Sequence, residues 1–242
     1  MAEKIQAIVI KSNDRKEKDK SILLFSLEKG KVWATLRGVK SAGAKMKLAK
    51  SPFCFGEFIL EEGKAGYVVT SFEAKETFHE ISEDVDKYFE ATSILEMVYA
   101  YDFSNLEEVQ AIFVLVLKSL MRICFAKCQT LYVLNKFFLE VFKLSGFPLY
   151  SEICTCCKSK SFLKHYINFP NGEIVCNNCK NFDSQELSGA CFSALKILSE
   201  TSFEKLDTIK LAQNSEFELL KILVKNFECH FDKKLKLLGI LS

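Results

Sequence analysis

Apolar and polar residues alternate along roughly the first 75 positions in short runs, a pattern typical of β-strands joined by turns. The runs are Lys4–Lys11, Ser21–Leu27, Lys31–Leu36, Phe53–Leu60 and Gly66–Phe72. Turn compositions separate the second run from the third (Glu28-Lys29-Gly30) and the fourth from the fifth (residues 61–65). A small open sheet would leave its edges exposed, so five short strands predict a closed barrel in residues 1–78. An OB-type barrel fits the number and length of the strands, and an SH3-like barrel fits almost as well.

From about Val85 onward, apolar residues recur at helical spacing. The segments with this period are 85–99, Leu106–Phe125, Leu131–Leu144, Leu187–Glu200 and Ser215–Phe231. The middle of Leu106–Phe125 is apolar on nearly all sides, which indicates a buried helix. We therefore expect an α+β protein, in which the barrel is followed by an all-α domain in residues 79–242.

Four cysteines interrupt the helical region as two pairs, Cys154-x2-Cys157 and Cys176-x2-Cys179, with eighteen residues between the inner two. This spacing predicts one tetrahedral Zn²⁺ per chain, held by four thiolates. Because protein ligands fill all four positions, we expect a structural metal. The zinc element is an insertion at about residues 150–182, with a β-hairpin between its pairs. Cys156 is interpreted as a bystander, and its exchange with a neighbouring ligand stays open.

Other uses of these cysteines fit less well. Disulfides need an oxidising compartment, and the N-terminal residues lack the apolar stretch of a secretion signal. A thioredoxin-like site would use one pair only. A deaminase would need a His-x-Glu motif, but Ile81 and Ile167 stand two residues after His79 and His165. The remaining cysteines in apolar neighbourhoods are expected to be reduced core thiols: Cys54, Cys124, Cys128, Cys191 and Cys229.

The net charge of +2 is unevenly distributed. Residues 1–50 contain 13 Lys and Arg against 5 Asp and Glu, whereas residues 51–110 contain 3 against 14. Such asymmetry is typical of a polyanion-binding surface with a separate protein-facing surface. Solvated faces of opposite sign on one domain explain it equally well.

The basic residues of the N-terminal part fall into two clusters, expected in the connections after the first and third strands. Connections at these places can border one face of a small barrel, so we expect the clusters to converge on nucleic acid phosphates. The predicted DNA contacts are Lys11, Arg15, Lys16, Lys20, Arg37, Lys40, Lys45, Lys47 and Lys50. Phe25, Trp33 and Tyr67 are candidates for stacking on bases, with filling of the barrel as the alternative for each.

Signals of catalysis or of membrane insertion are weak. The sequence has no glycine-rich phosphate loop and no recognisable catalytic triad, and its three histidines are isolated. We therefore expect no enzymatic activity. The longest uncharged apolar run, Val109 to Leu117, is too short to span a membrane.

In their order along the chain, several motifs resemble the RecO family of bacterial recombination mediators, and the resemblance covers essentially the whole sequence. They are the loop 14–19, Glu28-Lys29-Gly30-Lys31, Leu36-Arg37-Gly38-Val39-Lys40, Pro52-Phe53, Glu61-Glu62-Gly63, Gly146-Phe147-Pro148 before the cysteine pairs, and the ending Lys233-Lys234-Leu235-Lys236-Leu237. The stretch after Leu36 looks like the basic stretch of the family, although it is rich in lysine where many members have arginine.

The resemblance implies an N-terminal OB fold that binds single- and double-stranded DNA and anneals complementary strands. It also implies cooperation with a RecR-type partner, contact with the tail of a single-strand-binding protein, and indirect action on a RecA-type recombinase. The location implied is the bacterial cytoplasm, in association with the nucleoid. Two alternatives stay open: a zinc-ribbon scaffold that binds only proteins, and a zinc enzyme such as a nuclease, which the closed four-thiolate site disfavours.

Overall fold

The computed structural model describes residues 2–15, 19–39, 44–64, 66–125, 130–160, 163–169 and 171–236. The chain forms two compact units. The first comprises Met1–Ala91 with Asp102–Leu120, and the second comprises Thr92–Tyr101 with Met121–Ser242.

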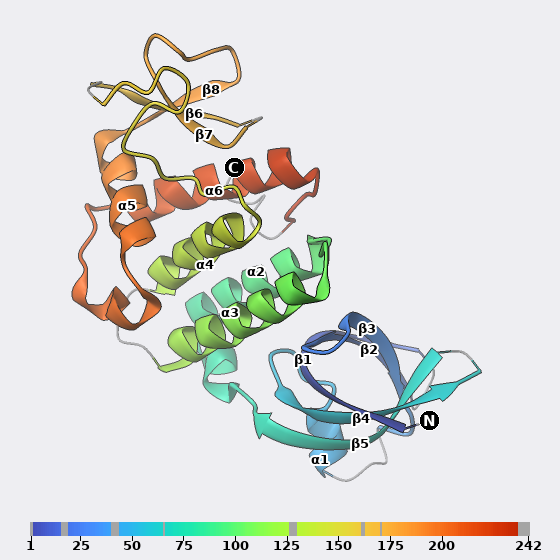
Figure 1. Ribbon diagram of the computed structural model, residues 1–242. Coiled ribbons are helices and arrows are strands. Elements are labelled where there is room, and N and C mark those ends of the chain that lie inside the picture. Colours follow the sequence, from blue (N-terminus) through green and yellow to red (C-terminus); the bar gives the residue numbers. More distant parts are fainter. Residues whose placement is uncertain are drawn as a thin grey trace. The chain divides into compact units, whose positions relative to one another are not determined.

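The first unit contains a closed barrel of five strands, as the alternation predicts (Figure 1). The strands are β1 (Ala2–Asp14), β2 (Lys20–Ser26), β3 (Gly30–Leu36), β4 (Phe55–Gly63) and β5 (Gly66–Glu76), closed in the order β1-β2-β3-β5-β4. β1 pairs antiparallel with both β2 and β4, and the short parallel pairing of Ala34 with Tyr67 joins β3 to β5. This strand order confirms the prediction of an OB-type barrel and excludes the SH3-like alternative.

Alternate residues of each strand fill the barrel, because successive side chains of a strand point to opposite faces. Phe58 and Phe72 meet inside with ring centroids 4.5 Å apart. A short helix that the sequence pattern did not predict, α1 (Ala44–Leu48), lies between β3 and β4, and Met46 packs against the barrel core. Gly56 on β4 is required by close approach, because a Cβ atom there would lie 2.3 Å from the Glu73 carbonyl oxygen.

The outer face of β2 is covered within the same unit by residues that follow the barrel. Phe25 is fully buried, and its ring centroid lies 5.1 Å from that of Phe103 and 5.6 Å from that of Phe113. Phe113 belongs to α3 (Leu106–Phe125), which follows η1 (His79–Glu83) and α2 (Val85–Ala100). This packing places Phe25 outside the barrel interior.

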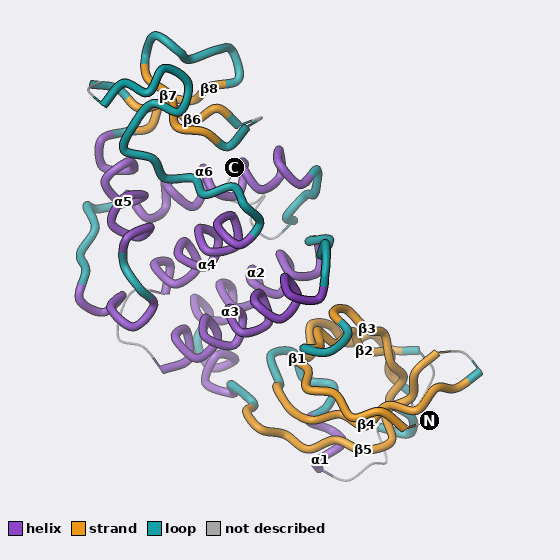
Figure 2. The backbone as a smooth tube through the Cα atoms, viewed as in Figure 1, coloured by secondary structure: helices purple, strands orange, loops and turns teal. Residues whose placement is uncertain are grey.

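The second unit is helical, with a small sheet inserted. Its later helices are α4 (Thr130–Leu144), α5 (Gly189–Glu200) and α6 (Ser215–Phe231), with η2 (Phe203–Thr208) before α6. Phe138 and Phe227 are fully buried and contact each other in its core. The inserted sheet has the order β7-β6-β8 and contains the predicted hairpin, β6 (His165–Asn168) and β7 (Glu173–Cys176), together with an additional strand, β8 (Ser184–Leu187) (Figure 2).

Several sequence-based placements need correction. Lys11 lies within β1 and Lys20 begins β2, so neither belongs to the connection between these strands, because β1 is longer than its apolar run. Cys54, Cys124 and Cys191 are buried as expected, but Cys229 is exposed. Cys128 falls outside the described residues.

Candidate nucleic-acid interface and metal centre

One residue from each predicted basic cluster lines a shared pocket on the barrel. This pocket, called here the arginine pocket, has a volume of about 320 Å³ and is lined by Arg15, Asp19, Thr35, Arg37, Gly63, Gly66 and Val68. Arg15 Nη1 donates a hydrogen bond to Thr35 Oγ1 at 2.6 Å. Arg15 thus reaches β3, and Arg37, which directly follows β3, lines the same pocket; both side chains are exposed. Planar guanidinium groups suit bidentate recognition of phosphate oxygens.

The backbone around the arginine pocket is held by Asp19. Its carboxylate Oδ1 accepts the Gly38 N–H at 2.9 Å, and its carbonyl oxygen accepts the Arg15 N–H at 3.1 Å. Gly38 has φ +60°, a left-handed conformation that glycine adopts without strain. Asp19 therefore ties the end of β1 to the end of β3 and positions both arginines.

The other predicted DNA-contacting residues are distributed differently. Lys20 Nζ lies 3.2 Å from the Asp14 carboxylate, which the β1–β2 register places opposite it. Lys47 belongs to α1 and is exposed, and Lys50 is half-buried just after that helix; neither lines the arginine pocket. Lys11 is exposed on β1. Lys16 and Lys40 lie outside the described residues, as does the side chain of Lys45.

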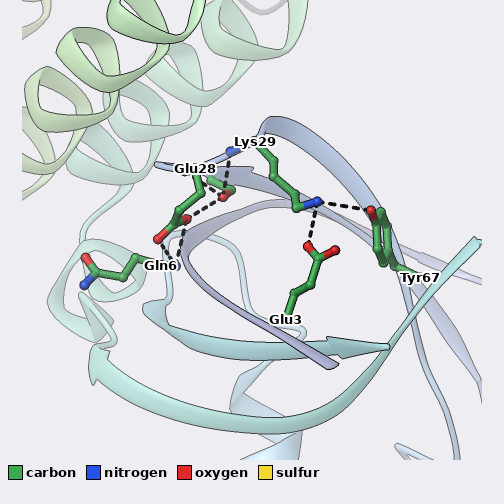
Figure 3. Close-up of polar contacts among 6 residues, drawn as sticks. Glu3, Gln6, Glu28, Lys29 and Tyr67 are labelled. Carbon is green, nitrogen blue, oxygen red and sulfur yellow. Dashed lines mark hydrogen bonds and ion pairs between the residues drawn. The ribbon is translucent and has the colours of Figure 1, made fainter. Parts of the chain in front are cut away.

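A separate polar cluster forms around the β2–β3 turn (Figure 3). Lys29 Nζ lies 2.6 Å from the Glu3 carboxylate and donates to the Tyr67 hydroxyl at 3.2 Å. The hydrogen bond to Glu3 and, to a smaller extent, the one to Tyr67 raise the pKa of Lys29. Glu28 accepts the Gln6 N–H at 3.0 Å and the Ser26 hydroxyl at 2.8 Å. The turn is therefore fixed to β1, and its lysine is committed to contacts within the barrel.

The three candidate aromatic residues have separate environments. Phe25 is buried against Phe103, and Tyr67 packs against the barrel core with its hydroxyl bonded to Lys29. Tyr67 thus follows the alternative of filling the barrel, whereas Phe25 is buried outside the barrel interior, against residues that follow the barrel. Trp33 is 45% exposed on the outer face of β3. Only Trp33 of the three presents a large ring surface to solvent.

The four paired cysteines converge on one point in the second unit. Their Sγ atoms all lie within 4.8 Å of one another, and those of Cys157 and Cys176 are 3.8 Å apart. A tetrahedral site with Zn–S bonds of about 2.3 Å has S–S separations of about 3.8 Å. The donor set and the spacing therefore fit one thiolate-bound metal ion.

The environment of Cys154 favours its thiolate. Burial raises the pKa of Cys154, but the backbone N–H groups of Cys157, Cys176 and Cys156 outweigh it and lower the pKa to about 6. The Cys176 N–H lies 3.3 Å from Cys154 Sγ. Thiolate is the form that ligates metals. In contrast, burial raises the pKa of Cys191 to about 12, as expected for an inert core thiol.

The cysteine-bearing sheet is anchored on helices of its own unit. The His165 ring stacks on Phe192 of α5 with centroids 3.5 Å apart. Lys225 of α6 places Nζ 4.1 Å from the Phe169 ring centroid and donates to Gln185 Oε1 at 3.0 Å. Thr155, inside the first cysteine pair, donates both its N–H and its hydroxyl to the Ile174 carbonyl at 3.0 Å. A metal at the four thiols would therefore join the first cysteine pair to an already supported sheet.

Some residues of the arginine pocket were not predicted from the sequence. Thr35, Gly63 and Gly66 carry no charge, and they meet Arg15 only because the barrel closes. Asp19 could have been found, since one carboxylate among lysines beside a turn is a common way to bind backbone N–H groups. The two arginines themselves were predicted.

Family models match nearly all of the chain. The model described as "Recombination protein O N terminal" matches residues 1–78, and the one described as "Recombination protein O C terminal" matches residues 82–239. The chain is 28% identical over 242 residues to a protein of Clostridium novyi called DNA repair protein RecO, covering 99% of this chain and 93% of that one. Another protein so named, from Desulforamulus reducens, is 28% identical over 237 residues, with 96% and 91% covered.

Among the described residues, none of the helices combines the length and the apolar composition needed to cross a membrane.

Proposed function

Because the chain belongs to the RecO family of DNA repair proteins, we propose that it is a non-catalytic recombination mediator that binds DNA through its barrel. It binds single and double strands, anneals complementary strands, and helps a recombinase load onto strands coated by single-strand-binding protein. It is located in the bacterial cytoplasm, in association with the nucleoid. The barrel in residues 1–78 is the DNA-binding domain, and residues 79–242 form the helical domain.

The observation that supports this proposal most is the meeting of Arg15 and Arg37 in the arginine pocket. Two exposed arginines that line one pocket of the barrel can each neutralise a phosphate, without reading a base edge. Contacts of this kind position a strand without selecting its sequence. The lysines at 11, 20, 47 and 50 add positive charge to the same N-terminal segment, as do Lys16, Lys40 and Lys45.

Annealing follows from phosphate neutralisation. Two complementary strands repel each other through their backbones, and base pairing is favourable once this repulsion is reduced. A surface that holds one strand by its phosphates leaves the bases accessible to the second strand. The helical domain provides the surfaces for a RecR-type partner and for the tail of a single-strand-binding protein, and a RecA-type recombinase is affected indirectly.

We propose that Cys154, Cys157, Cys176 and Cys179 hold one structural Zn²⁺. When bound, the ion crosslinks the first cysteine pair to the end of β7. The chain itself holds the thiol groups within coordination distance and excludes solvent from Cys154 and Cys176, which are buried. The ion takes no part in DNA contact.

A salt titration separates this proposal from a scaffold that binds only proteins. We expect the affinity for a single-stranded oligonucleotide to fall with salt in a log–log plot, with a slope of about −0.7 per phosphate contacted. A surface that contacts several phosphates therefore gives a log–log slope of several units. The affinity at each salt concentration is measured by the fluorescence anisotropy of a labelled oligonucleotide. An affinity that is absent at low salt, or independent of salt, would reject DNA binding through this surface.

Mediation is tested by the annealing of complementary oligonucleotides with and without bound single-strand-binding protein. We expect acceleration in both cases, with no shortening of the strands on a denaturing gel. Strand cleavage would contradict the non-catalytic assignment. If the protein accelerated the annealing of bare strands but not of strands coated by single-strand-binding protein, the mediator part of the proposal would be rejected and the annealing part would stand.

A further inference from the structure

Trp33 is an exposed ring beside the arginine pocket. Trp33 lies on the same face of β3 as Lys31 and Thr35, since alternate residues of a strand share a face, and Arg37 directly follows the last residue of β3. Thr35, two residues from Trp33 and so about 7 Å along the strand, accepts the hydrogen bond from Arg15. Trp33 therefore has, on its own face of β3, a neighbouring residue that is hydrogen-bonded to Arg15.

Trp33 is 45% exposed although it lies within β3. Its cross-strand neighbour on β2 is Leu23, which is buried, and Lys11 of β1 pairs with Leu23 on the other side. β3 pairs with β5 only at Ala34 and Thr35, so Trp33 lies at the place where the described pairing of β3 with β5 ends. A single exposed aromatic residue is ordinary on a protein surface. Its combination with a neighbouring pocket, which contains Thr35 of the same strand face and two arginines, is what indicates a ligand.

We infer that Trp33 is a stacking platform for an unpaired base of the strand whose phosphates contact the arginine pocket. This inference rests on the proposed DNA-binding function and deepens it. Every base has a π-face, so stacking adds affinity without sequence preference. In a duplex the base faces are covered by neighbouring bases, so Trp33 would favour single strands. The lysine and arginine contacts are available to both forms of DNA.

The test uses the fact that Trp33 is the only tryptophan of the chain. We expect a single-stranded oligothymidylate to quench the intrinsic fluorescence of the full-length protein. An oligonucleotide of the same length with abasic sugars presents the same phosphates without rings, and it should bind without quenching. Equal quenching by the two would overturn the inference, because it would report charge or conformational change instead of stacking.

Variants give an independent measurement. Trp33→Leu keeps apolar cover over Leu23 but removes the large ring, and we expect it to weaken single-strand binding about tenfold. Binding of a blunt duplex should be unchanged, which also shows that the barrel is folded. Trp33→Phe should restore most of the single-strand affinity. Equal single-strand affinity of wild type and Trp33→Leu would contradict stacking.

These outcomes differ from a failure of the proposed function itself. If the protein bound no DNA, neither the abasic nor the thymidylate oligonucleotide would bind at low salt. If only the stacking were wrong, both would bind with salt dependence, and the fluorescence and the Leu variant would show no effect of the base.

Discussion

Replacing Cys176 by Ser should abolish stoichiometric zinc and unfold the β6–β8 sheet. Cys176 is buried at the end of β7, 3.8 Å from Cys157 Sγ, so its loss removes a central ligand. Structural zinc contributes roughly 10–16 kcal/mol of apparent binding free energy in small zinc domains. The packing of the sheet on α5 and α6 compensates for part of this loss, so we expect a destabilisation of several kcal/mol in the second unit. Metal analysis and thermal melting measure the two effects.

Cys229→Ser is the matched control, because Cys229 is exposed and lies outside the cysteine cluster. It should retain one zinc per chain and melt like the wild type. If Cys176→Ser is recovered only as an insoluble protein, chelation of the soluble wild type gives the same information. A wild type that contains no metal after purification, or a Cys176→Ser variant with full zinc and unchanged melting, would show that the proposed site is wrong.

Cys156 gives a second comparison at the same site. It lies inside the first pair and is exposed. As a bystander it should be replaceable by Ser with one zinc retained. A variant lacking Cys157 but still holding one zinc would instead show that Cys156 exchanges into the coordination sphere.

The parts of the fold that depend on local pattern were predictable. The strands follow from period-two alternation and turn residues, and the metal cluster follows from a fixed spacing of four thiols. β8 was missed because Ser184–Leu187 contains no β-branched residue, and it becomes a strand only by pairing with β6. The five-residue helix α1 is too short to display a helical period.

The parts of the candidate site that depend on barrel closure were not predictable. The β1–β2 register sets Lys20 against Asp14, so this predicted phosphate contact is already ion-paired. The same closure brings Gly63 and Gly66 to Arg15. Exposure of Trp33 depends on where the β3–β5 pairing ends, which no local pattern encodes.

The combined substitution of Arg15 and Arg37 by Ala should cause the largest loss of DNA affinity among the barrel variants considered. Each phosphate contact contributes about 0.7 to the salt slope for a single strand, so two contacts lower it by about 1.4. If the wild type and the variant bind equally at 1 M salt, this difference in slope makes the affinity of the variant at 50 mM salt weaker by a factor on the order of 50. Because these groups contact the backbone, the loss should be nearly equal for strands of different sequence.

A control with the same change in net charge distinguishes the pocket from general electrostatics. Lys4 of β1 and Lys75 of β5 do not line the arginine pocket, and both contact the Glu57 carboxylate, at 2.8 and 3.7 Å. Their combined substitution by Ala removes two positive charges without touching the arginine pocket. We expect it to change the affinity by only a few-fold, since charges separated by more than about 10 Å are largely screened at 0.1 M salt.

The two double variants together locate the interface. If DNA binding used only the overall charge of the barrel, both would weaken binding to the same extent and shift the salt slope equally. If it uses the arginine pocket, the slope falls only for the Arg15 and Arg37 variant, while the melting of the barrel stays close to that of the wild type because both side chains are exposed. A strong dependence of the loss on sequence would mean that the arginines read bases, and the phosphate-contact mechanism would then have to be abandoned.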